Sequence, residues 1–430
     1  MLEGAPTAQE VEVIDTPRPC TQSKTGKPSL TGKRVGMVVF SPYPADPRPR
    51  RAAEALLSEG MELDYICEGD ERLPKREIVA GGMNVIRLPL KHHRGGKISY
   101  AYQYSAFILL SACILAWRSL RKKYALIYVH NMPDVLVFCA LFPKMLGAKV
   151  ILDQHDPMPE LMKTIFNLGN ESLAVRVIWQ LEKLSVSFAD LVVTVNVACK
   201  RLFSDRGCRP EKIGIVMNSP DDKIFPYQAA RSYDVNRSPT RPFVVMYHGS
   251  LVERNGLDLA VKALVRVRRT IPNIELKICG KATPFLDRVM EEARGAGLDG
   301  AIRYLGSKRL EELVGEIQNC DVGIIPNQRN AFTDINTPTR IFEYLALGKP
   351  VIAPETPGIR DYFGRDDLLY FDSGNADSLS LAITKAYSGA SEMIELAERG
   401  QQVYLAHTWQ REREMLVNLV SDLLKGAQLP

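Results

Sequence analysis

Residues 333–353 read T-D-I-N-T-P-T-R-I-F-E-Y-L-A-L-G-K-P-V-I-A and contain the signals for a helix followed by a buried strand. Thr337 can cap the helix, and Pro338 suits its first turn because no N–H is needed there. Apolar residues then recur at helical spacing until Gly348, which ends the helix. The short apolar run Val351–Ala353 predicts a strand inside a parallel sheet. This stretch therefore indicates an α/β fold.

Two charged residues of the predicted helix, Arg340 and Glu343, lie three positions apart and share one helix face. Free N–H groups at a helix N-terminus and a nearby arginine attract an anion such as a diphosphate. A carboxylate one turn further along can hold a sugar hydroxyl. The alternative is an ordinary α/β helix with an exposed ion pair, and the spacing alone does not decide between the two.

The residues of this stretch resemble the nucleotide-sugar site of retaining glycosyltransferases with the GT-B fold, glycosyltransferase family 4. That family carries two glutamates separated by seven residues, and Glu343 matches the second, which meets the ribose of the donor. The first position falls on Ile335, a departure from the family pattern, with Asp334 beside it as a stand-in. The resemblance implies a donor site that includes Asp334, Thr337, Pro338, Arg340 and Glu343.

The composition describes a globular chain of two domains. Its 430 residues, 46% hydrophobic and 24% charged, are too many for one ordinary core. The net charge of +5 is too small to indicate a nucleic-acid partner. Eight cysteines without a C-x-x-C pair argue against a zinc site and for buried thiols in a reducing compartment. No run of eighteen apolar residues and no secretion signal occur, so we expect a cytoplasmic protein without a transmembrane helix.

The resemblance covers nearly all of residues 34–424 and implies the GT-B architecture, two Rossmann-like α/β domains that face each other across a cleft. We expect a flexible tail over residues 1–32, an N-terminal acceptor domain over residues 33–227 and a linker over residues 228–242. A C-terminal nucleotide-sugar domain is expected over residues 243–405. A last helix, over residues 406–430, is expected to cross back onto the N-terminal domain.

Three arginines, Arg48, Arg50 and Arg51, stand where family members often place a glycine-rich turn after the first strand. They can bind an anionic acceptor, although the start of a solvated basic helix is the simpler interpretation.

Residues 100–120 form the most apolar helix candidate, and a basic cluster surrounds its end at residues 118–123. A packed crossover helix is the default interpretation. The alternative is a patch that touches the membrane surface, with the basic cluster attracted to anionic lipid.

Polar clusters follow two predicted strands, residues 126–129 and 149–152, at the edge where open α/β sheets build their sites. The second cluster, residues 153–160, reads D-Q-H-D-P-M-P-E and resembles the acceptor-side loop of a family 4 subgroup. That resemblance implies that His155 approaches the reacting sugar of the donor. Acceptor contacts are expected from Asn131, Asp156 and Asn218. A zinc site formed by His155 and the two neighbouring acids is the alternative.

The second domain opens with a strand, residues 243–247, and the run H-G-S-L-V-E-R-N-G, residues 248–256, which again predicts an anion site at a helix N-terminus. Most family members have an arginine and a lysine where this chain has Ser250 and Asn255. We expect Arg254 to supply the missing charge to a diphosphate, with an exposed salt bridge as the alternative. The remaining expected donor contacts are Gly249, Ser250, Asn255, Lys281, Leu305 and Gly306.

Two further patterns concern phosphate and metal binding. Residues 295–300 spell G-x-G-x-x-G but follow a predicted helix and precede a strand, so we expect a helix C-terminal turn and not a dinucleotide site. No Asp-x-Asp occurs in the chain, so we expect no metal-bridged diphosphate, no metal and no other cofactor. Helix dipoles with Arg254 and Arg340 would then balance the leaving charge.

The whole sequence predicts a hexosyltransferase-type glycosyltransferase that moves a sugar from a nucleotide-diphospho-sugar to a glycan or lipid-linked acceptor in polysaccharide or glycoconjugate synthesis. The resemblance implies retention of the anomeric configuration, and His155, Arg254 and Glu343 are the catalytic candidates. One alternative is a GT-B nucleotide-sugar epimerase or hydrolase. Another is a non-catalytic nucleotide-sugar-binding partner in a glycan assembly. A cytoplasmic location is expected, and one alternative places the protein at the inner face of the membrane.

Overall fold

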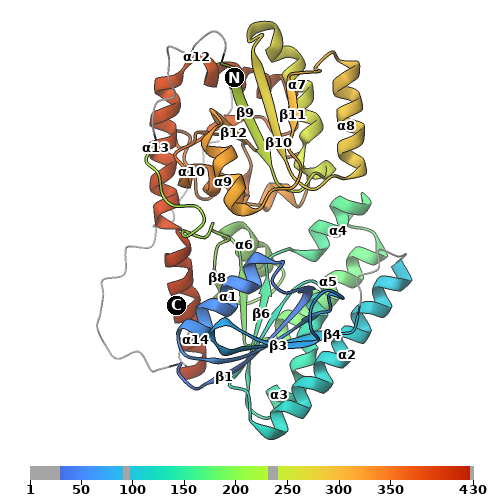
Figure 1. Cartoon of the computed structure of the whole chain (residues 1–430). Helices are drawn as coiled ribbons and strands as arrows, with labels where there is room; N and C mark the ends of the chain where they lie inside the picture. The colour runs from blue at the N-terminus through green and yellow to red at the C-terminus, as the bar shows by residue number, and fades with distance from the viewer. Residues whose placement is uncertain (1–29, 91–96, 231–240, 427–430) are drawn as a thin grey trace, which may run out of the picture.

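The computed structural model describes residues 30–90, 97–230 and 241–426. Within these residues the chain forms two α/β domains, each built on its own sheet and stacked one above the other (Figure 1). Most of the predicted tail and most of the predicted linker lie outside the described residues. Leu30, at the start of the described part, packs in the core of the first domain.

An eight-stranded sheet forms the first domain, in the order β3-β4-β2-β1-β5-β6-β7-β8. Neighbouring strands are parallel except for β3 and β4. Apart from β3 the strands are mostly buried, as expected for a parallel sheet covered on both faces. The strands are β1 (Arg34–Pro42), β2 (Glu62–Glu68), β3 (Arg76–Val79), β4 (Met83–Leu88), β5 (Leu126–His130), β6 (Lys149–Gln154), β7 (Leu191–Thr194) and β8 (Ile213–Ile215).

Helices cover both faces of the first sheet. One face packs against α1 and α14, and the other packs against α2, η2, α5 and α6. The helical segments of this half of the chain are α1 (Pro47–Ser58), η1 (Ala80–Gly82), α2 (Lys97–Arg121), η2 (Asp134–Ala140), α3 (Leu141–Met145), α4 (Met158–Phe166), α5 (Leu173–Phe188), α6 (Val197–Asp205) and η3 (Pro210–Lys212).

A six-stranded parallel sheet forms the second domain, in the order β11-β10-β9-β12-β13-β14. Its strands are β9 (Phe243–His248), β10 (Ile274–Cys279), β11 (Ile302–Tyr304), β12 (Val322–Ile324), β13 (Val351–Pro354) and β14 (Leu369–Phe371). The helical segments of this half of the chain are η4 (Glu253–Asn255), α7 (Leu257–Thr270), α8 (Pro284–Gly295), α9 (Leu310–Gln318), η5 (Thr333–Ile335), α10 (Thr339–Ala346), α11 (Pro357–Arg360), α12 (Ala376–Ser388), α13 (Ala390–Ala406) and α14 (Trp409–Lys425).

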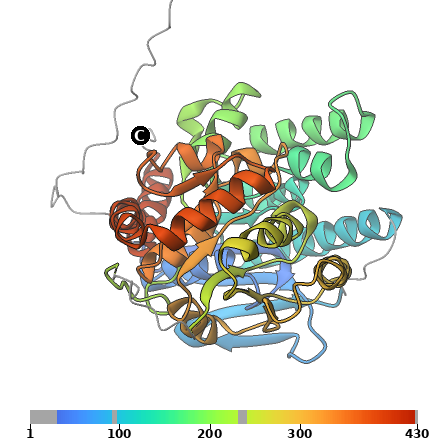
Figure 2. The same ribbon diagram turned by 90° about the horizontal axis from the view of Figure 1, so that it is seen from above.

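The last helix returns to the first domain, as predicted. Leu416 and Val420 of α14 belong to the apolar cluster that also contains Ala52 and Leu56 of α1. Figure 1 shows α13 beside the second domain and α14 continuing down onto the first, and Figure 2 shows the same arrangement from above. The fold is therefore the predicted pair of Rossmann-like domains with a C-terminal helix that joins them.

The main chain passes from the first core to the second between Val216 and Met217. Val216 packs in the first-domain core and Met217 in the second-domain core. The backbone N–H of Met217 donates to Glu412 Oε2 of α14 at 2.7 Å, and Tyr404 Oη donates to Asp222 Oδ1 at 3.2 Å. These two bonds join the segment where the chain leaves the first domain to α13 and α14, through which the chain returns to it.

One helix, over Tyr102–Arg121 within α2, is long and apolar enough to cross a membrane by length and composition alone, with a mean hydropathy of 1.2. Only 28% of that window is buried in the fold. Phe107 and Leu115 are fully buried against the first sheet, which agrees with the predicted crossover helix.

The G-x-G-x-x-G run is a helix C-terminal turn, as predicted. The helix α8 ends at Gly295, and Gly297 and Gly300 adopt φ values of +69° and +79° in open space. No phosphate cradle is formed there, because the run leads from a helix towards a strand.

Candidate functional site

Three glycines end the first strands of the second domain: Gly249 after β9, Gly280 after β10 and Gly306 near β11. Gly249 and Gly306 adopt φ values of +121° and +74°, which favour glycine. A Cβ on Gly280 would lie 2.3 Å from the carbonyl oxygen of Gly249, and the Gly280 N–H donates to Gly306 O at 2.9 Å. The three loops therefore approach one another closely and form a glycine ledge at the carboxyl edge of the sheet, where α/β domains bind ligands.

The loop from Gly249 to Gly256 closes on its own backbone. The carbonyl oxygen of Ser250 accepts from Tyr247 Oη and from Asn255 Nδ2, both at 2.8 Å. Gly256 has a φ of +68° and starts α7, and a Cβ there would lie 1.7 Å from Pro326 O. The amide of Asn255 is thus used inside the loop, while the side chain of Ser250 is exposed.

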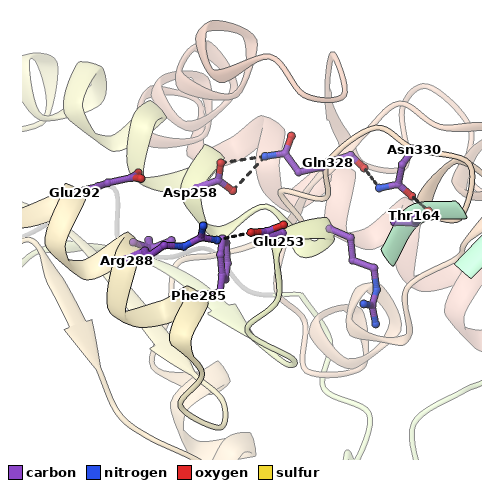
Figure 3. A pocket seen from close by; sticks show the side chains of 10 residues that line it. Thr164, Glu253, Asp258, Phe285, Arg288, Glu292, Gln328 and Asn330 are labelled. Carbon is purple, nitrogen blue, oxygen red and sulfur yellow. Dashed lines mark hydrogen bonds and ion pairs between the residues drawn. The ribbon is translucent and has the colours of Figure 1, made fainter. Parts of the chain in front are cut away.

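Arg254 lies in the 3₁₀ turn η4, next to a cavity of about 430 Å³ (Figure 3). Its neighbour Glu253 is paired with Arg288, but no carboxylate of the described residues is paired with Arg254. The guanidinium carbon of Arg254 lies 5.7 Å from the ring centre of Phe332. The sequence left a salt bridge as the alternative for Arg254, and within the described residues that alternative is not observed.

The cavity beside Arg254 is formed by both domains. Thr164 of α4 in the first domain donates from Oγ1 to Asn330 Oδ1 at 3.1 Å. On the other side, Gln328 Nε2 donates to Asp258 of α7 at 3.1 Å (Figure 3). Arg254 therefore stands at the boundary between the domains.

Arg340, in the first turn of α10, is held under the glycine ledge. Its Nη1 donates to the carbonyl oxygen of His248 at 2.9 Å and its Nη2 donates to Asn327 Oδ1 at 3.0 Å. Its guanidinium carbon lies 4.9 Å from the ring centre of Tyr247, and its Cδ would lie 3.2 Å from a Cβ on Gly249. The cation is thus fixed beside the loop that starts the predicted diphosphate site.

Glu343 and His248 form the buried centre of the site. Glu343 Oε2 lies 3.1 Å from His248 Nε2. Burial raises the pKa of Glu343 to about 7, against the opposing effect of Arg340 and of Arg51 from the first domain. Burial, and then Arg340, lower the pKa of His248 to about 3. Near neutral pH the His248 imidazole is therefore uncharged, and the Glu343 carboxyl group titrates between its neutral and its charged form.

The segment before α10 contacts the first domain. Asn196 Nδ2 donates to Ile335 O at 2.8 Å and to Thr337 Oγ1 at 3.1 Å. Thr337 Oγ1 donates to Gly358 O at 2.6 Å, so the prediction that Thr337 caps the helix was wrong. Pro338 takes the N-cap position without a side-chain bond, and the helix starts at Thr339. The Thr337 hydroxyl group therefore bonds to Asn196 and Gly358 and does not cap the helix.

Two predicted donor contacts, Lys281 and Leu305, and the stand-in acid Asp334 complete the predicted donor residues. Lys281 is exposed, and the backbone N–H of Leu305 donates to Ile278 O at 2.9 Å. Asp334 lies 3.8 Å from Arg329 Nε, and burial raises its pKa. Its carboxyl group therefore already has a cationic neighbour.

In the first domain, Asp153 is the centre of a buried network at the end of β6. Arg48 donates to Asp153 Oδ1 from Nε at 3.0 Å and from Nη2 at 2.8 Å, and Tyr128 Oη donates to Oδ2 at 2.9 Å. Burial would raise the pKa of Asp153, but Arg48, His130 and His155 lower it below its usual value. Asp153 is thus a buried anion that positions the groups around it.

His130, Asp153 and His155 bring one ligand atom each to within 4.8 Å of one another. The sequence alternative was a zinc site of His155 with acids, and His130 was not part of it. Arg48 and Tyr128 already donate to both carboxylate oxygens of Asp153. A metal ion would have to replace those bonds beside a guanidinium cation, so these residues do not fit a zinc site.

His155 lies at the edge of this network with 15% of its side chain exposed. Its backbone N–H donates to Asn131 Oδ1 at 3.2 Å, and Asn131 Nδ2 donates to Asp156 O at 2.7 Å and to Asp134 Oδ1 at 3.0 Å. Asn131 is itself only 5% exposed. Asn131 was predicted to contact the acceptor, but its side chain holds the loop that carries His155.

Arg48 and Arg51 are buried and bonded within the protein. Both sequence interpretations, an anionic-acceptor site and the start of a solvated basic helix, are therefore wrong for these two residues. Besides Asp153, Arg48 binds Val216 O and Asn218 Oδ1 at 2.9 Å each, and Arg51 donates to Ser219 O. Neither forms a solvated helix surface. Asn218, a predicted acceptor contact, accepts from Arg48, which ties the first helix to the crossing between the domains.

Both domains match known families. Residues 230–403 match the family described as "Glycosyl transferases group 1", and residues 45–219 match the "Glycosyl transferase 4-like domain". The chain belongs to the group 1 glycosyl transferases. The two matched regions hold the glycine ledge and the Asp153 network, so both halves of the candidate site lie within regions that match glycosyl transferase families.

Curated relatives of this glycosyl transferase differ in the share of the chain that they cover. A glycogen synthase of Mycobacterium tuberculosis (strain ATCC 25618 / H37Rv) is 27% identical over 148 residues, 34% of this chain and 33% of that protein. The chain thus spans about a third of the length of the glycogen synthases it matches. The chitobiosyldiphosphodolichol beta-mannosyltransferase of Candida glabrata is 21% identical over 355 residues, 76% of this chain and 77% of that protein.

A solved structure of similar fold is sucrose-phosphate synthase from Thermosynechococcus elongatus, with a TM-score of 0.73 and 16% identity. The match covers 92% of this glycosyl transferase and 100% of that chain. At this identity the likeness concerns the fold alone, and it confirms the predicted GT-B fold.

The sequence did not identify three groups of this glycosyl transferase's site: His248, Asn196 and His130. His248 and His130 each end a central strand of their sheets, at the edge where such folds bind ligands. That position was a usable signal for both. Asn196 contacts Thr337, 141 residues further along the chain, and no local pattern indicates such a contact.

Proposed function

We propose that this glycosyl transferase moves a sugar from a nucleotide-diphospho-sugar to a glycan or lipid-linked acceptor, with retention and without a metal ion. The observation that carries the proposal is that Arg340 and Glu343 lie at the glycine ledge of the second domain, while Arg254 belongs to the loop that begins at Gly249. Of the matched relatives, the one aligned over 76% of this chain is named for a sugar acceptor linked to a diphospho-dolichol.

The ledge supplies what a diphosphate needs. The backbone approaches closely at Gly249, and α7 begins directly after Gly256 with its first N–H groups unpaired within the helix. Arg254, without a carboxylate partner among the described residues, and Arg340, fixed at the strand ends, add two positive charges. Together these groups neutralise the charge that develops on a departing diphosphate.

Glu343 supplies the second element, recognition of the nucleoside. Its carboxyl group stands one turn along α10 from Arg340, with His248 behind it at 3.1 Å. A carboxylate in that place accepts hydrogen bonds from the ribose hydroxyl groups. His248, neutral at physiological pH, adds no positive charge next to the carboxylate, so the carboxylate oxygens stay available to the ligand.

The transfer itself breaks the bond between the anomeric carbon and the diphosphate oxygen, whose electron pair stays with the diphosphate. The acceptor hydroxyl oxygen forms the new bond on the same face, and its proton passes to an oxygen of the departing diphosphate. His155, held by Asn131 at the end of the first sheet, contacts the sugar during this step. The acceptor enters from the side of the first domain.

A thermal-shift series with purified protein tests the donor site. UDP, GDP, ADP and their sugar conjugates are added without a divalent metal, and a ligand of the folded state raises the melting temperature. We expect one base to give a clear shift. In Arg254→Ala we expect that shift to disappear at unchanged melting temperature of the free protein, while Arg294→Ala, an exposed arginine of α8, keeps it.

Turnover then separates the proposal from its alternatives. Transfer of labelled sugar to an acceptor supports the proposal, while an epimerised free sugar would indicate the epimerase or hydrolase. Binding without turnover on any acceptor would favour a non-catalytic nucleotide-sugar-binding partner. A missing shift with every nucleotide would refute the roles of Glu343 and Arg254.

A further inference from the structure

Three helices on one side of the first domain carry a second apolar face that packs on nothing within the described residues. The inner sides of α2 and α5 cover the first sheet. The helices α2, α3 and α5, which are labelled in Figure 1, all contact η2. Their outer sides hold many of the exposed large apolar side chains of the described chain. Most isolated apolar residues on a surface need no explanation, but a continuous group of this size does.

On α2 the exposed apolar residues form a straight stripe. Tyr102, Leu109, Trp117 and Leu120 are 72%, 65%, 47% and 72% exposed. Their spacings of seven, eight and three residues keep them on one helix face, while Phe107 and Leu115 face the sheet. The helix is therefore apolar on two sides, and only one of them is used by the fold.

The same pattern recurs on α5 and α3. Leu173, Val177 and Leu184 of α5 are 76%, 48% and 57% exposed, at spacings of four and seven residues. Leu141 and Met145 of α3, at 55% and 76%, are one turn apart. Because α3 contacts α2 and both contact η2, which also contacts α5, the three stripes lie on neighbouring helices; together they are here called the apolar face.

A basic cavity adjoins the apolar face at the C-terminal end of α2. It has a volume of about 560 Å³, and Trp117 of the stripe is part of its wall. Five cationic side chains line it, against the two carboxylates of Glu62 and Asp64; the cations are Arg34, Arg76, Arg118, Arg121 and Lys122. The cavity therefore carries an excess of positive charge.

Both carboxylates of the cavity already form ion pairs with cations that line it. Asp64 accepts from Arg34 at 2.5 Å and from Arg118 at 2.6 Å, and Glu62 is paired with Lys122. Arg121 has no carboxylate partner within the described residues, and its guanidinium carbon lies 3.8 Å from the ring centre of Trp117. A planar cation stacked on an interfacial tryptophan is well placed to bind a phosphate.

We propose that the apolar face docks on an anionic phospholipid bilayer, with a lipid phosphate group in the basic cavity at the end of α2. Leucine and tryptophan side chains of the face enter the boundary between headgroups and acyl chains, as in interfacial amphipathic helices. Lys122 and Lys123, at the end of the stripe, and Lys183 on α5 add attraction to the negatively charged surface. The proposed docking on a bilayer does not depend on which sugar the protein binds.

Charge decides between a bilayer and a second protein chain as occupant. A protein interface of this size has no need of a cation-rich cavity at its edge, whereas a bilayer presents phosphate groups beside its apolar layer. The stripes of α2 and α5 also lie on helices that cover one face of the same sheet, which suits a broad planar partner.

Vesicle flotation with the full chain tests the proposal. Vesicles of phosphatidylcholine with one quarter phosphatidylglycerol should carry the protein upward, and pure phosphatidylcholine vesicles should carry much less. We expect Leu120→Glu and Leu184→Glu each to lower binding about tenfold or more, because a charge replaces a side chain that enters the bilayer. Arg121→Glu should lower binding about fivefold or more, and raised salt should weaken binding of the parent protein.

Leu381→Glu is the matched control. Leu381 is 71% exposed, like Leu120, but lies on α12 of the second domain, so its substitution should leave flotation unchanged. Equal loss in Leu381→Glu and Leu120→Glu, or no flotation of the parent protein with phosphatidylglycerol at low salt, would overturn the proposal. A dimer in solution that Leu120→Glu dissociates, without vesicle binding, would assign the face to a second copy instead. Nucleotide-induced thermal shifts should be equal in all variants, which separates this test from that of the donor site.

Discussion

The pKa of Glu343 leads to a prediction about stability that requires no substrate. Burial raises that pKa from an ordinary 4.5 to about 7, so the folded state holds the proton more tightly than the unfolded chain does. As the pH rises from about 4.5 to about 7, the unfolded chain loses its proton first and becomes relatively more favourable. Glu343 therefore lowers the free energy of unfolding above pH 7 and costs little below pH 5.

The size of the effect follows from the two pKa values. The cost of the buried carboxyl group is about 0.8 kcal/mol at pH 5 and about 3.3 kcal/mol at pH 8. A glutamine side chain has nearly the same shape as a glutamate side chain but does not titrate. Compared with the parent protein, Glu343→Gln should therefore gain about 2.5 kcal/mol in free energy of unfolding when the pH is raised from 5 to 8.

Urea unfolding followed by far-ultraviolet circular dichroism at both pH values measures this gain. Glu395→Gln, on the exposed side of α13, is the control and should show the same difference from the parent at both pH values. A difference between Glu343→Gln and the parent that does not change with pH would refute the raised pKa of this buried carboxyl group. Glu343→Gln should also bind the nucleotide more weakly, since stability and function oppose each other at this residue.

The remaining predictions concern packing between and within the domains. Arg48→Ala leaves the buried Asp153 carboxylate without its ion pair and should lower the free energy of unfolding by about 3–5 kcal/mol, measured by urea unfolding. Arg201→Ala removes an ion pair with Asp361 between the domains, but Arg201 is half exposed, so the melting temperature should hardly change. Ile335→Glu restores the glutamate of the family pattern, yet it places a carboxylate against the first-domain apolar core. It should lower the melting temperature without raising turnover, and a more active Ile335→Glu would contradict this explanation of the isoleucine.

The fold could be predicted because its signals are local and repeated. Buried apolar runs such as Val351–Ala353 alternate with amphipathic helices throughout the chain, and this alternation predicts parallel sheets. The proximity of the expected donor residues Gly249, Arg340 and Glu343 could be predicted for the same reason, since they belong to two short motifs, while their role in binding a donor stays a prediction. The helix start was misplaced by one residue, because a threonine before a proline is a typical cap by sequence while Gly358 O takes the hydroxyl of Thr337.

The acceptor side was predicted less well because its contacts join distant parts of the chain. Arg48 reaches Asp153, 105 residues away, and Asn218, 170 residues away. A sequence shows three nearby arginines and suggests a solvated surface or a site for an anion. Only the folded structure shows that the carboxylate of Asp153, at the end of β6, is buried and requires a cation beside it.

The segment between β12 and α10 links the position of the first domain to the donor site. Asn196 donates to Ile335 O and to Thr337 Oγ1, which lie four and two residues before Thr339, the first residue of the helix that carries Arg340. Because both acceptors belong to the segment directly before α10, a rotation that separated the domains would remove two of the bonds that hold that segment. Ile335 adds apolar contact with the first domain at the same point. A change in the angle between the domains would therefore disturb the segment that leads into α10, and Ile335, at the position of the family's first glutamate, makes part of this contact.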